Sequence, residues 1–475
     1  MQRSDRDETD SPAELVLRGG AVLALDAAGT RGTAVAVRRG RVVLVGSDAE
    51  VQPLIGAGTR VIELDGRAVI PGINDSHLHA SWLGALWPDT VFGAMGEQGD
   101  AVAFEGDPHD AAPAAPLITS AGEARAAILR AGRLAASLGI TSYTEPGLGP
   151  GEDAGATGCF GQLVLDEYRA LAAERALTAR VTVLMLFGVL DGPSELGSFT
   201  ARLNATVRET GQPDWLRIAG VKIFADGIPP MLQAWTRRSY PDGSSGDLLV
   251  AGADIAEREA SLRQMISAAH LAGFQVGVHA TGDRAIEVVA DAVAHAQAAA
   301  PAELRHYVIH GDLVARESLS AMAGLGMGLN VQAGIAVLTA PWLAGVLGEQ
   351  AAADAWPLAE ALAAGVSLSL SSDAPVLSPD WREGIAAADA WMGSPAPGEE
   401  EQRMLALLHA YTVAPARQDG AEAWKGSLEP GKVADLVVLA ADPLTVAPAE
   451  LPGVAVDLTV VDGEVVFERE AALVG

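Results

Sequence analysis

Two histidines stand two residues apart at the end of an apolar run. The run begins at Ala68, passes Pro71-Gly72 and ends in Asp75-Ser-His-Leu-His79. On a strand, residues i and i+2 point to the same side, so the imidazoles of His77 and His79 would project together. Two imidazoles at one strand end can bind a metal ion, although a His-x-His sequence also occurs by chance.

Two further histidines end short apolar runs, and an aspartate follows a third run. His279 closes Phe274-Gln-Val-Gly-Val-His279, and His310 closes Tyr307-Val-Ile-His310. Each could be a metal ligand or a buried histidine bonded to a backbone carbonyl. Asp373, which follows Leu368-Ser-Leu-Ser-Ser, could bind metal and accept the proton of a bound water. Its alternative role is that of a turn residue or helix cap.

A lysine and a glutamate lie in similar patterns. Lys222 stands inside an apolar run, where a buried cation needs a partner or a changed protonation state. Carboxylation by CO2 would make it an anionic ligand that bridges two metals; otherwise it could snorkel or pair with Asp226. Glu145 ends Thr141-Ser-Tyr-Thr-Glu145 and could be a ligand, a substrate contact or the partner of a ligand histidine.

The elements that must position these residues alternate between β runs and helical patterns from about 71 to 424, which predicts βα units around a parallel sheet. Eight strands are expected at Val69–His79, Thr141–Glu145, Ala179–Leu186, Leu216–Ala225, Gln275–His279, Tyr307–His310, Gly328–Val331 and Val366–Ser371. Helices are expected at Ser120–Leu138, Gln162–Glu174, Ile255–Ala272, Arg284–Ala298, Arg316–Ala323 and Pro357–Ala364. The fold class is therefore α/β, a (β/α)8 barrel whose active site is built at the carboxyl ends of the strands.

The two ends of the chain carry short β runs separated by turns. Residues 12–70 and 425–475 are expected to combine into one discontinuous β-sandwich domain, into which the barrel at 71–424 is inserted. Residues 1–11 read as a disordered acidic tail. The segment Ser81–Thr119 has no clear periodicity, and a loop of this length is expected to be a lid over the barrel.

The composition excludes several classes of protein. A net charge of −29 would repel a phosphate backbone, so nucleic acid is not an expected partner. The single cysteine, Cys159, excludes an internal disulfide framework and fits a reducing cytosol. No apolar run is long enough to span a membrane, and the charged start is no signal peptide. These features predict a cytoplasmic protein with a small-molecule substrate, and they allow a homodimer.

Together these segments resemble the amidohydrolase superfamily of metal-dependent hydrolases. Within it, the chain is similar to the branch of YtcJ-like proteins and N-substituted formamide deformylases. The resemblance covers nearly the whole chain and is carried by Val69–His79, Val221–Gly227, Val278–Ala285, Ser371–Val376 and Gly426–Leu436.

The resemblance implies a site with two divalent metal ions, expected to be Zn²⁺. His77, His79 and Asp373 would hold one ion, His279 and His310 the other, and the carbamate of Lys222 would bridge them. A hydroxide between the ions would attack a carbonyl, and Asp373 would pass the proton to the leaving amine, which cleaves a C–N bond in an amide or formamide-like substrate. Contacts with the substrate are expected from Trp82, Glu145, Asp283, Arg284 and Gln332.

Two other functions stay open. A mononuclear deaminase of the same superfamily would carry His-x-x-Glu at the fifth strand, whereas His279 is followed by Ala280-Thr281-Gly282 and Asp283 stands one residue too far. A non-catalytic binding relative would be expected to lose metal ligands, but all the implied positions are filled.

Overall fold

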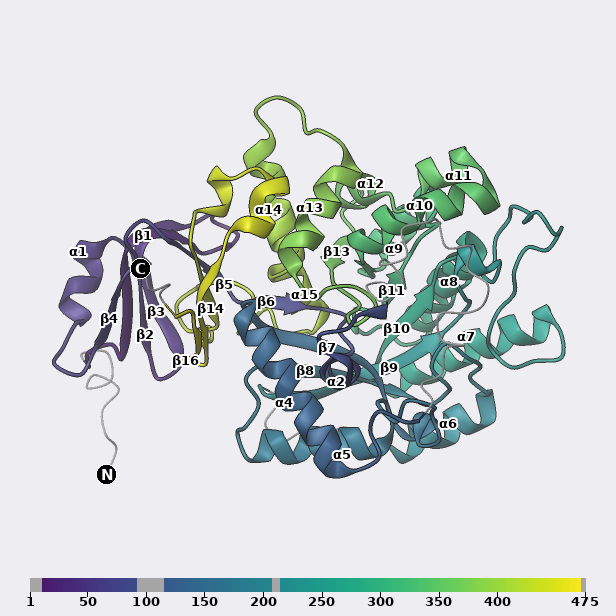
Figure 1. The fold of residues 1–475 in the computed structure, drawn as a ribbon. Helices are drawn as coiled ribbons and strands as arrows, with labels where there is room; N and C mark the ends of the chain where they lie inside the picture. The colour runs from purple at the N-terminus through teal and green to yellow at the C-terminus, as the bar shows by residue number, and fades with distance from the viewer. Residues whose placement is uncertain (1–10, 92–114, 207–213, 471–475) are drawn as a thin grey trace.

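The computed structural model describes residues 11–91, 115–206 and 214–470, which form a small β domain beside a larger barrel (Figure 1). All but the last residue of the expected tail and most of the expected lid lie outside the described residues. The two ends of the described chain meet in the β domain, while the middle of the chain forms the barrel. Among the described residues, no helix is long and apolar enough to cross a membrane.

The barrel contains eight parallel strands whose neighbours follow chain order. They are β6 (Ile73–Asp75), β7 (Ile140–Leu148), β8 (Arg180–Leu186), β9 (Leu216–Phe224), β10 (Gln275–Ala280), β11 (Tyr307–His310), β12 (Gly328–Val331) and β13 (Ser367–Leu370). Parallel strands require crossover connections, and helices supply them here. The predicted (β/α)8 barrel is confirmed.

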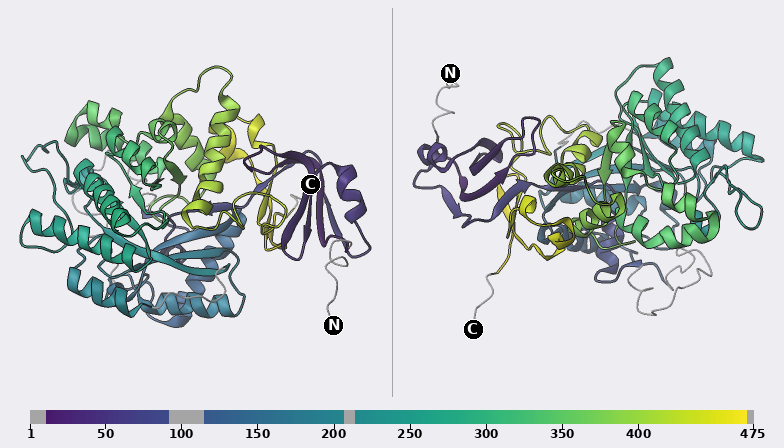
Figure 2. Two further views of the ribbon diagram at one scale, coloured as in Figure 1. Left: turned by 180° about the vertical axis from the view of Figure 1, so that it is seen from behind. Right: turned by 90° about the horizontal axis from the view of Figure 1, so that it is seen from above.

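Helices cover the outer side of the barrel strands (Figure 2). The longer helices are α4 (Ala121–Ser137), α5 (Gln162–Ala173), α6 (Leu196–Ala205), α7 (Ile255–Leu271), α8 (Asp283–Ala299), α9 (Arg316–Gly324), α10 (Ala333–Leu347), α13 (Trp381–Met392) and α14 (Glu400–Ala410). The shorter helices are α1 (Asp48–Val51), α2 (Ala80–Leu86), α11 (Glu349–Asp354), α12 (Leu358–Ala363) and α15 (Val413–Gln418). Side-chain caps fix some helix starts: Ser120 accepts a hydrogen bond from the Glu123 amide, and Asp254 accepts one from the Glu257 amide.

The β domain is one eight-stranded, mainly antiparallel sheet built from both ends of the chain. Its strands are β1 (Leu15–Leu23), β2 (Arg31–Arg38), β3 (Arg41–Gly46), β4 (Arg60–Glu63), β5 (Ala68–Pro71), β14 (Leu436–Leu439), β15 (Val456–Val461) and β16 (Glu464–Glu468). Strand β1 is irregular between Arg18 and Val22, and it pairs with β4 before this point and with β5 after it. Buried side chains from both ends of the chain, such as Leu17, Val69 and Val438, share one core.

The segment that carries the first two histidines departs from the expectation of one strand at Val69–His79. Strand β5 pairs with β14 in the β domain, whereas β6 pairs with β7 in the barrel, so one strand of each domain lies on either side of Gly72. A Cβ at Gly72 would lie 2.1 Å from Thr141 Oγ1, so only glycine lets the backbone pass this junction. Strand β6 ends at Asp75, and His77 and His79 therefore lie in the following turn.

A buried ion pair joins the two domains. Arg180, the first residue of β8, donates to both carboxylate oxygens of Asp435 at 2.7 and 3.0 Å and to Asp462 at 3.1 Å. The side chains of Arg180 and Asp435 are only 3% and 7% exposed. Asp435 directly precedes β14, so the guanidinium fixes the β domain against the start of a barrel strand. Breaking such a pair leaves an uncompensated buried charge.

Replacing Arg180 by Leu should lower the free energy of unfolding by about 3–5 kcal/mol, because the Asp435 carboxylate would lose its charged partner in the interior. Denaturant unfolding measures this loss. The matched control is Arg60→Ala, since Arg60 and its partner Glu468 are 49% and 59% exposed, and it should cost less than about 1 kcal/mol. Equal effects of the two substitutions would contradict a specific role for Arg180.

Candidate metal centre

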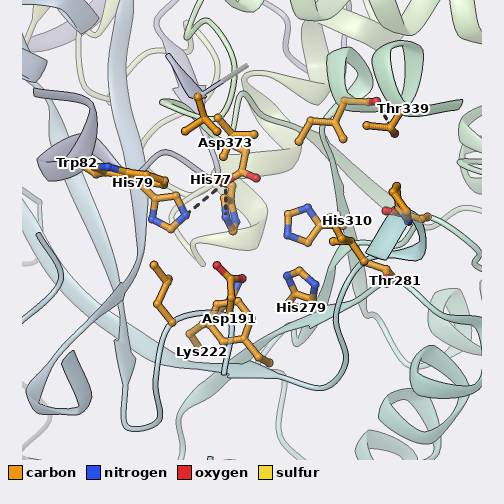
Figure 3. A pocket seen from close by; sticks show the side chains of 18 residues that line it. His77, His79, Trp82, Asp191, Lys222, His279, Thr281, His310, Thr339 and Asp373 are labelled. Atoms are coloured by element: carbon orange, nitrogen blue, oxygen red, sulfur yellow. Dashed lines mark hydrogen bonds and ion pairs between the residues drawn. The ribbon is translucent and has the colours of Figure 1, made fainter. Parts of the chain in front are cut away.

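One cavity at the carboxyl ends of the barrel strands brings together all six residues that the sequence predicts as metal ligands (Figure 3). They are His77, His79, Lys222, His279, His310 and Asp373. These residues follow or lie in the first, fourth, fifth, sixth and eighth strands of the barrel, so segments far apart in sequence meet at one point. This is the face on which (β/α)8 barrels build their sites.

The tightest group in the cavity consists of His77, His79 and Asp373. The Oδ1 atom of Asp373 lies 3.1 Å from His77 Nε2 and 3.4 Å from His79 Nε2. Each residue offers one ligand atom, and these atoms lie within 4.8 Å of one another. All three side chains are buried, and two imidazoles with one carboxylate form a typical donor set for a catalytic zinc ion.

Burial sets the protonation of this group. It lowers the pKa of His77 well below the ordinary value, which keeps the imidazole neutral and able to bind a metal. Burial would raise the pKa of Asp373, but the hydrogen bonds from His77 and His79 outweigh it and hold this pKa well below its ordinary range. The carboxylate is therefore ionised and the histidine neutral, as metal ligands must be.

The second pair of histidines lies beside the first group. The ring centres of His279 and His310 are 4.4 Å apart, and those of His77 and His310 are 5.5 Å apart. Burial lowers the pKa of His310 to about 4, so this ring too is neutral near pH 7. Within the described part of the chain, His279 Nε2 is buried without a hydrogen-bond partner. A metal ion would satisfy such a nitrogen, so the residues present fit a second ion.

Gln332 fixes the tautomer of His310. Its Oε1 lies 2.7 Å from His310 Nδ1, and its Nε2 donates to Asn330 Oδ1 at 3.0 Å and to Ser371 Oγ at 2.9 Å. Because the amide is oriented by these two bonds, its oxygen faces the ring and His310 Nδ1 carries the proton. Nε2 is then free for a metal. Gln332 thus contacts the predicted ligand His310 but is not itself among the residues that line the cavity.

Glu145 has a similar place behind His79. Its Oε2 accepts hydrogen bonds from Tyr168 at 2.7 Å and from the Ser81 amide at 3.0 Å, which leaves Oε1 3.9 Å from His79 Nδ1. Both Oε1 and Nδ1 are buried without a hydrogen-bond partner among the described residues. Of the three roles open for Glu145, this geometry favours the partner of a ligand histidine.

Lys222 is 1% exposed and reaches the cavity from β9. Burial lowers the pKa of its ammonium to about 8, and the Nζ atom lies 4.7 Å from the centre of the Phe224 ring. The alternative of a pair with Asp226 is not what the structure has. The Asp226 carboxylate instead accepts backbone hydrogen bonds from Trp235, Thr281 and Gly282.

The other predicted substrate contacts divide between the cavity and its surroundings. Trp82 lines the cavity, whereas Asp283 and Arg284 are not among the lining residues. Asp283 lies in the first turn of α8 and accepts a hydrogen bond from the Arg237 amide, and the guanidinium of Arg284 lies 5.5 Å from the ring centre of Trp235.

Sequence reasoning missed two acidic residues and most of the apolar wall. Asp191 and Asp312 both line the cavity. Asp312 stands two residues after His310, so the expectation that site residues follow the carboxyl ends of barrel strands could have identified it. Asp191 lies in a loop beyond the end of β8 and carries no such signal. The apolar wall consists of Trp82, Val91, Leu190, Phe224, Ile228, Pro230, Ile335 and Val376.

Comparisons with known proteins identify relatives of the chain. A family model described as "Amidohydrolase family" matches residues 100–467. The putative amidohydrolase YtcJ of Bacillus subtilis is 28% identical over 175 residues, which cover 37% of this chain and 32% of that protein. The N-substituted formamide deformylase of Arthrobacter pascens is 33% identical over 78 residues, 16% of this chain and 14% of that protein. The resemblance inferred from the sequence motifs is thereby confirmed.

Two further similarities concern a deaminase and the fold. The adenine deaminase of Paracoccus denitrificans is 42% identical over 106 residues, 22% of this chain and 17% of that protein. The chain thus spans a third or less of the length of these curated relatives. An uncharacterized metal-dependent hydrolase from Pyrococcus furiosus aligns with a TM-score of 0.69 at 21% identity, over 91% of this chain and 100% of that one, which is a likeness of fold alone.

Replacing Gln332 by Ala should weaken zinc binding about 10- to 100-fold, because His310 would lose the acceptor that holds its tautomer and orientation. Competition with a chromophoric chelator measures this affinity. Gln297→Ala is the matched control, since Gln297 bonds to the Leu325 carbonyl outside the cavity. Unchanged zinc affinity in the Gln332 variant would show that His310 is not a ligand held in this way.

Proposed function

Because the chain belongs to the amidohydrolase family, we propose that it is a metal-dependent hydrolase that cleaves a carbon–nitrogen bond in an amide or formamide-like small molecule. The observation that carries this proposal is the buried group of His77, His79 and Asp373, whose ligand atoms converge within 4.8 Å. A three-residue set with two imidazoles and one carboxylate is typical of a catalytic metal site that keeps a position open for water or substrate.

The proposed site holds two divalent ions, Zn²⁺ in the first instance. His77, His79 and Asp373 would hold the first ion, and His279 and His310 would hold the second. Lys222, buried between them as a carbamate formed with CO2, would bridge the two. Imidazole and carboxylate donors suit zinc, and the carbamate would remove a cation that is otherwise expensive to bury.

Bound ions would polarise the scissile carbonyl and lower the pKa of a water molecule. Asp373 would accept and transfer the proton. Its Oδ1 faces His77 Nε2 and His79 Nε2 at 3.1 and 3.4 Å, which leaves Oδ2 to accept the proton of the attacking water and pass it to the nitrogen of the leaving amine. The apolar wall of Trp82, Ile335 and Val376 would hold the apolar part of the substrate and exclude bulk water.

A second candidate is a mononuclear deaminase of the same family. It is favoured by the similarity to an adenine deaminase, and by the finding that, among the described residues, one group of three ligands is already close enough for a metal ion. In that function Asp373 would act on a ring amidine, and Lys222 would not be needed as a ligand. The number of bound ions distinguishes the two candidates.

Elemental analysis of the purified protein should find about two zinc ions per chain, falling to one or fewer in Lys222→Ala, because the bridge between the ions would be lost. Lys432→Ala is the control, since Lys432 pairs with Glu429 near the surface. One ion in both the wild type and the Lys222 variant would favour the deaminase, and adenine would be the next substrate tested.

Asp373→Asn should lower kcat for amide or formamide hydrolysis at saturating zinc by at least about 100-fold, because an amide cannot accept the proton of the attacking water. A panel of N-substituted formamides and amides, assayed by amine release, provides the measurement. Asp166→Asn, at a carboxylate that is 60% exposed, serves as the control and should keep wild-type activity. Full activity of the Asp373 variant would contradict its role as the base.

A further inference from the structure

A carboxylate outside the predicted ligand set lies among the residues that line the cavity. Asp191 follows β8, the third barrel strand, and lines the same cavity as the six predicted ligands. Figure 3 shows its carboxylate pointing into the cavity between Lys222 and His279. Neither the sequence motifs nor the resemblance assigns a role to this residue.

The loop that carries Asp191 is held in a strained conformation. Asp191 has φ +48°, in the left-handed region that non-glycine residues seldom adopt. His310 and Asp373, two of the predicted ligands, share positive φ values of +72° and +57°. The preceding amide, that of Leu190, donates to Glu152 Oε1 at 2.6 Å, and Glu152 is itself only 5% exposed. Of the eleven non-glycine residues with positive φ in the described part of the chain, these three line the cavity and the other eight do not.

In the proposed site, the second ion would have only two protein ligands unless Lys222 is carboxylated. Catalytic zinc sites commonly have three protein ligands, and the first ion would have them in His77, His79 and Asp373. For the second ion the predicted set offers two imidazoles and Lys222, whose ammonium cannot bind a cation. Asp191 lines the same cavity as Lys222 and the two imidazoles of this second set.

We propose that Asp191 is a ligand of the second metal ion, together with His279 and His310. The inference rests on the proposed two-ion site. In the described geometry, His77, His79 and Asp373 form the group whose ligand atoms lie within 4.8 Å, so Asp191 would turn toward the two rings as the ion binds. Asp191 would be a terminal ligand, and the Lys222 carbamate would bridge. Binding of the second ion would then persist in part when CO2 is removed.

The test is zinc binding by Asp191→Asn, measured by calorimetry and elemental analysis at buffered free zinc. The second ion should bind more than about 100-fold more weakly, beyond the loss expected for a residue that only orients a ligand, while the first ion keeps its affinity. With Co²⁺ in place of zinc, the visible absorption of the second ion should change. Asp191→Glu restores a carboxylate and should recover part of the affinity.

Asp312→Asn is the matched control, because Asp312 lines the same cavity but accepts a hydrogen bond from Trp356 Nε1 at 3.1 Å. If Asp312→Asn weakened the second ion as much as Asp191→Asn, general loss of negative charge would explain the effect, and the proposal would be overturned. Two ions bound with wild-type affinity in a folded Asp191→Asn protein would also overturn it, while the proposed hydrolase would stand. A single ion in the wild type would overturn the two-ion site and the role of Asp191 together.

Discussion

The closure of the barrel between its first and last strands is the constraint on which the metal centre depends. In the described sheet, β6 and β13 are the two end strands, and no ladder of backbone hydrogen bonds joins them. Single hydrogen bonds close this seam: the Asp373 amide donates to the His77 carbonyl at 2.8 Å, and the Ser372 amide donates to Asp75 Oδ1 at 3.2 Å. The same bonds bring the two histidines of the first strand against the aspartate of the last.

A buried network of polar side chains near the seam orients one of the predicted ligands, His310. Asn330 donates to Ser76 Oγ at 2.7 Å, and Ser371 donates to Asn330 Oδ1 at 2.6 Å. These buried groups satisfy one another, so their desolvation is offset, and each fixes the next. The chain of bonds ends at Gln332 and His310. This network holds His310 more firmly than apolar packing would, because the ring cannot rotate without breaking its hydrogen bond to Gln332.

Apolar periodicity and strand ends are local signals and were sufficient to predict the barrel. The six residues assigned as ligands through the family resemblance lie around one cavity, and their role as ligands stays a prediction. The sequence did not predict that His77 and His79 lie in a turn. Gly72 divides the expected strand between two domains, and only the pairing of β5 with β14 reveals this division. The places of Glu145 and Gln332 behind ligand histidines depend on contacts between distant segments. Asp191 was missed because its loop carries no periodic pattern, and its importance follows from its position in space.

The balance of charge in the cavity connects these observations. Burial keeps the histidines His77, His279 and His310 neutral, so imidazoles alone would leave the positive charge of two divalent ions unopposed in a poorly solvated site. Asp373 and a carbamate on Lys222 would offset half of that charge. With Asp191 as a third anionic ligand, the two ions and their ligands together would carry one positive charge, which the anionic nucleophile or the polarised carbonyl oxygen would offset. A site with this balance stabilises the charge that develops during attack more than it stabilises the neutral substrate, and that difference is what accelerates a reaction.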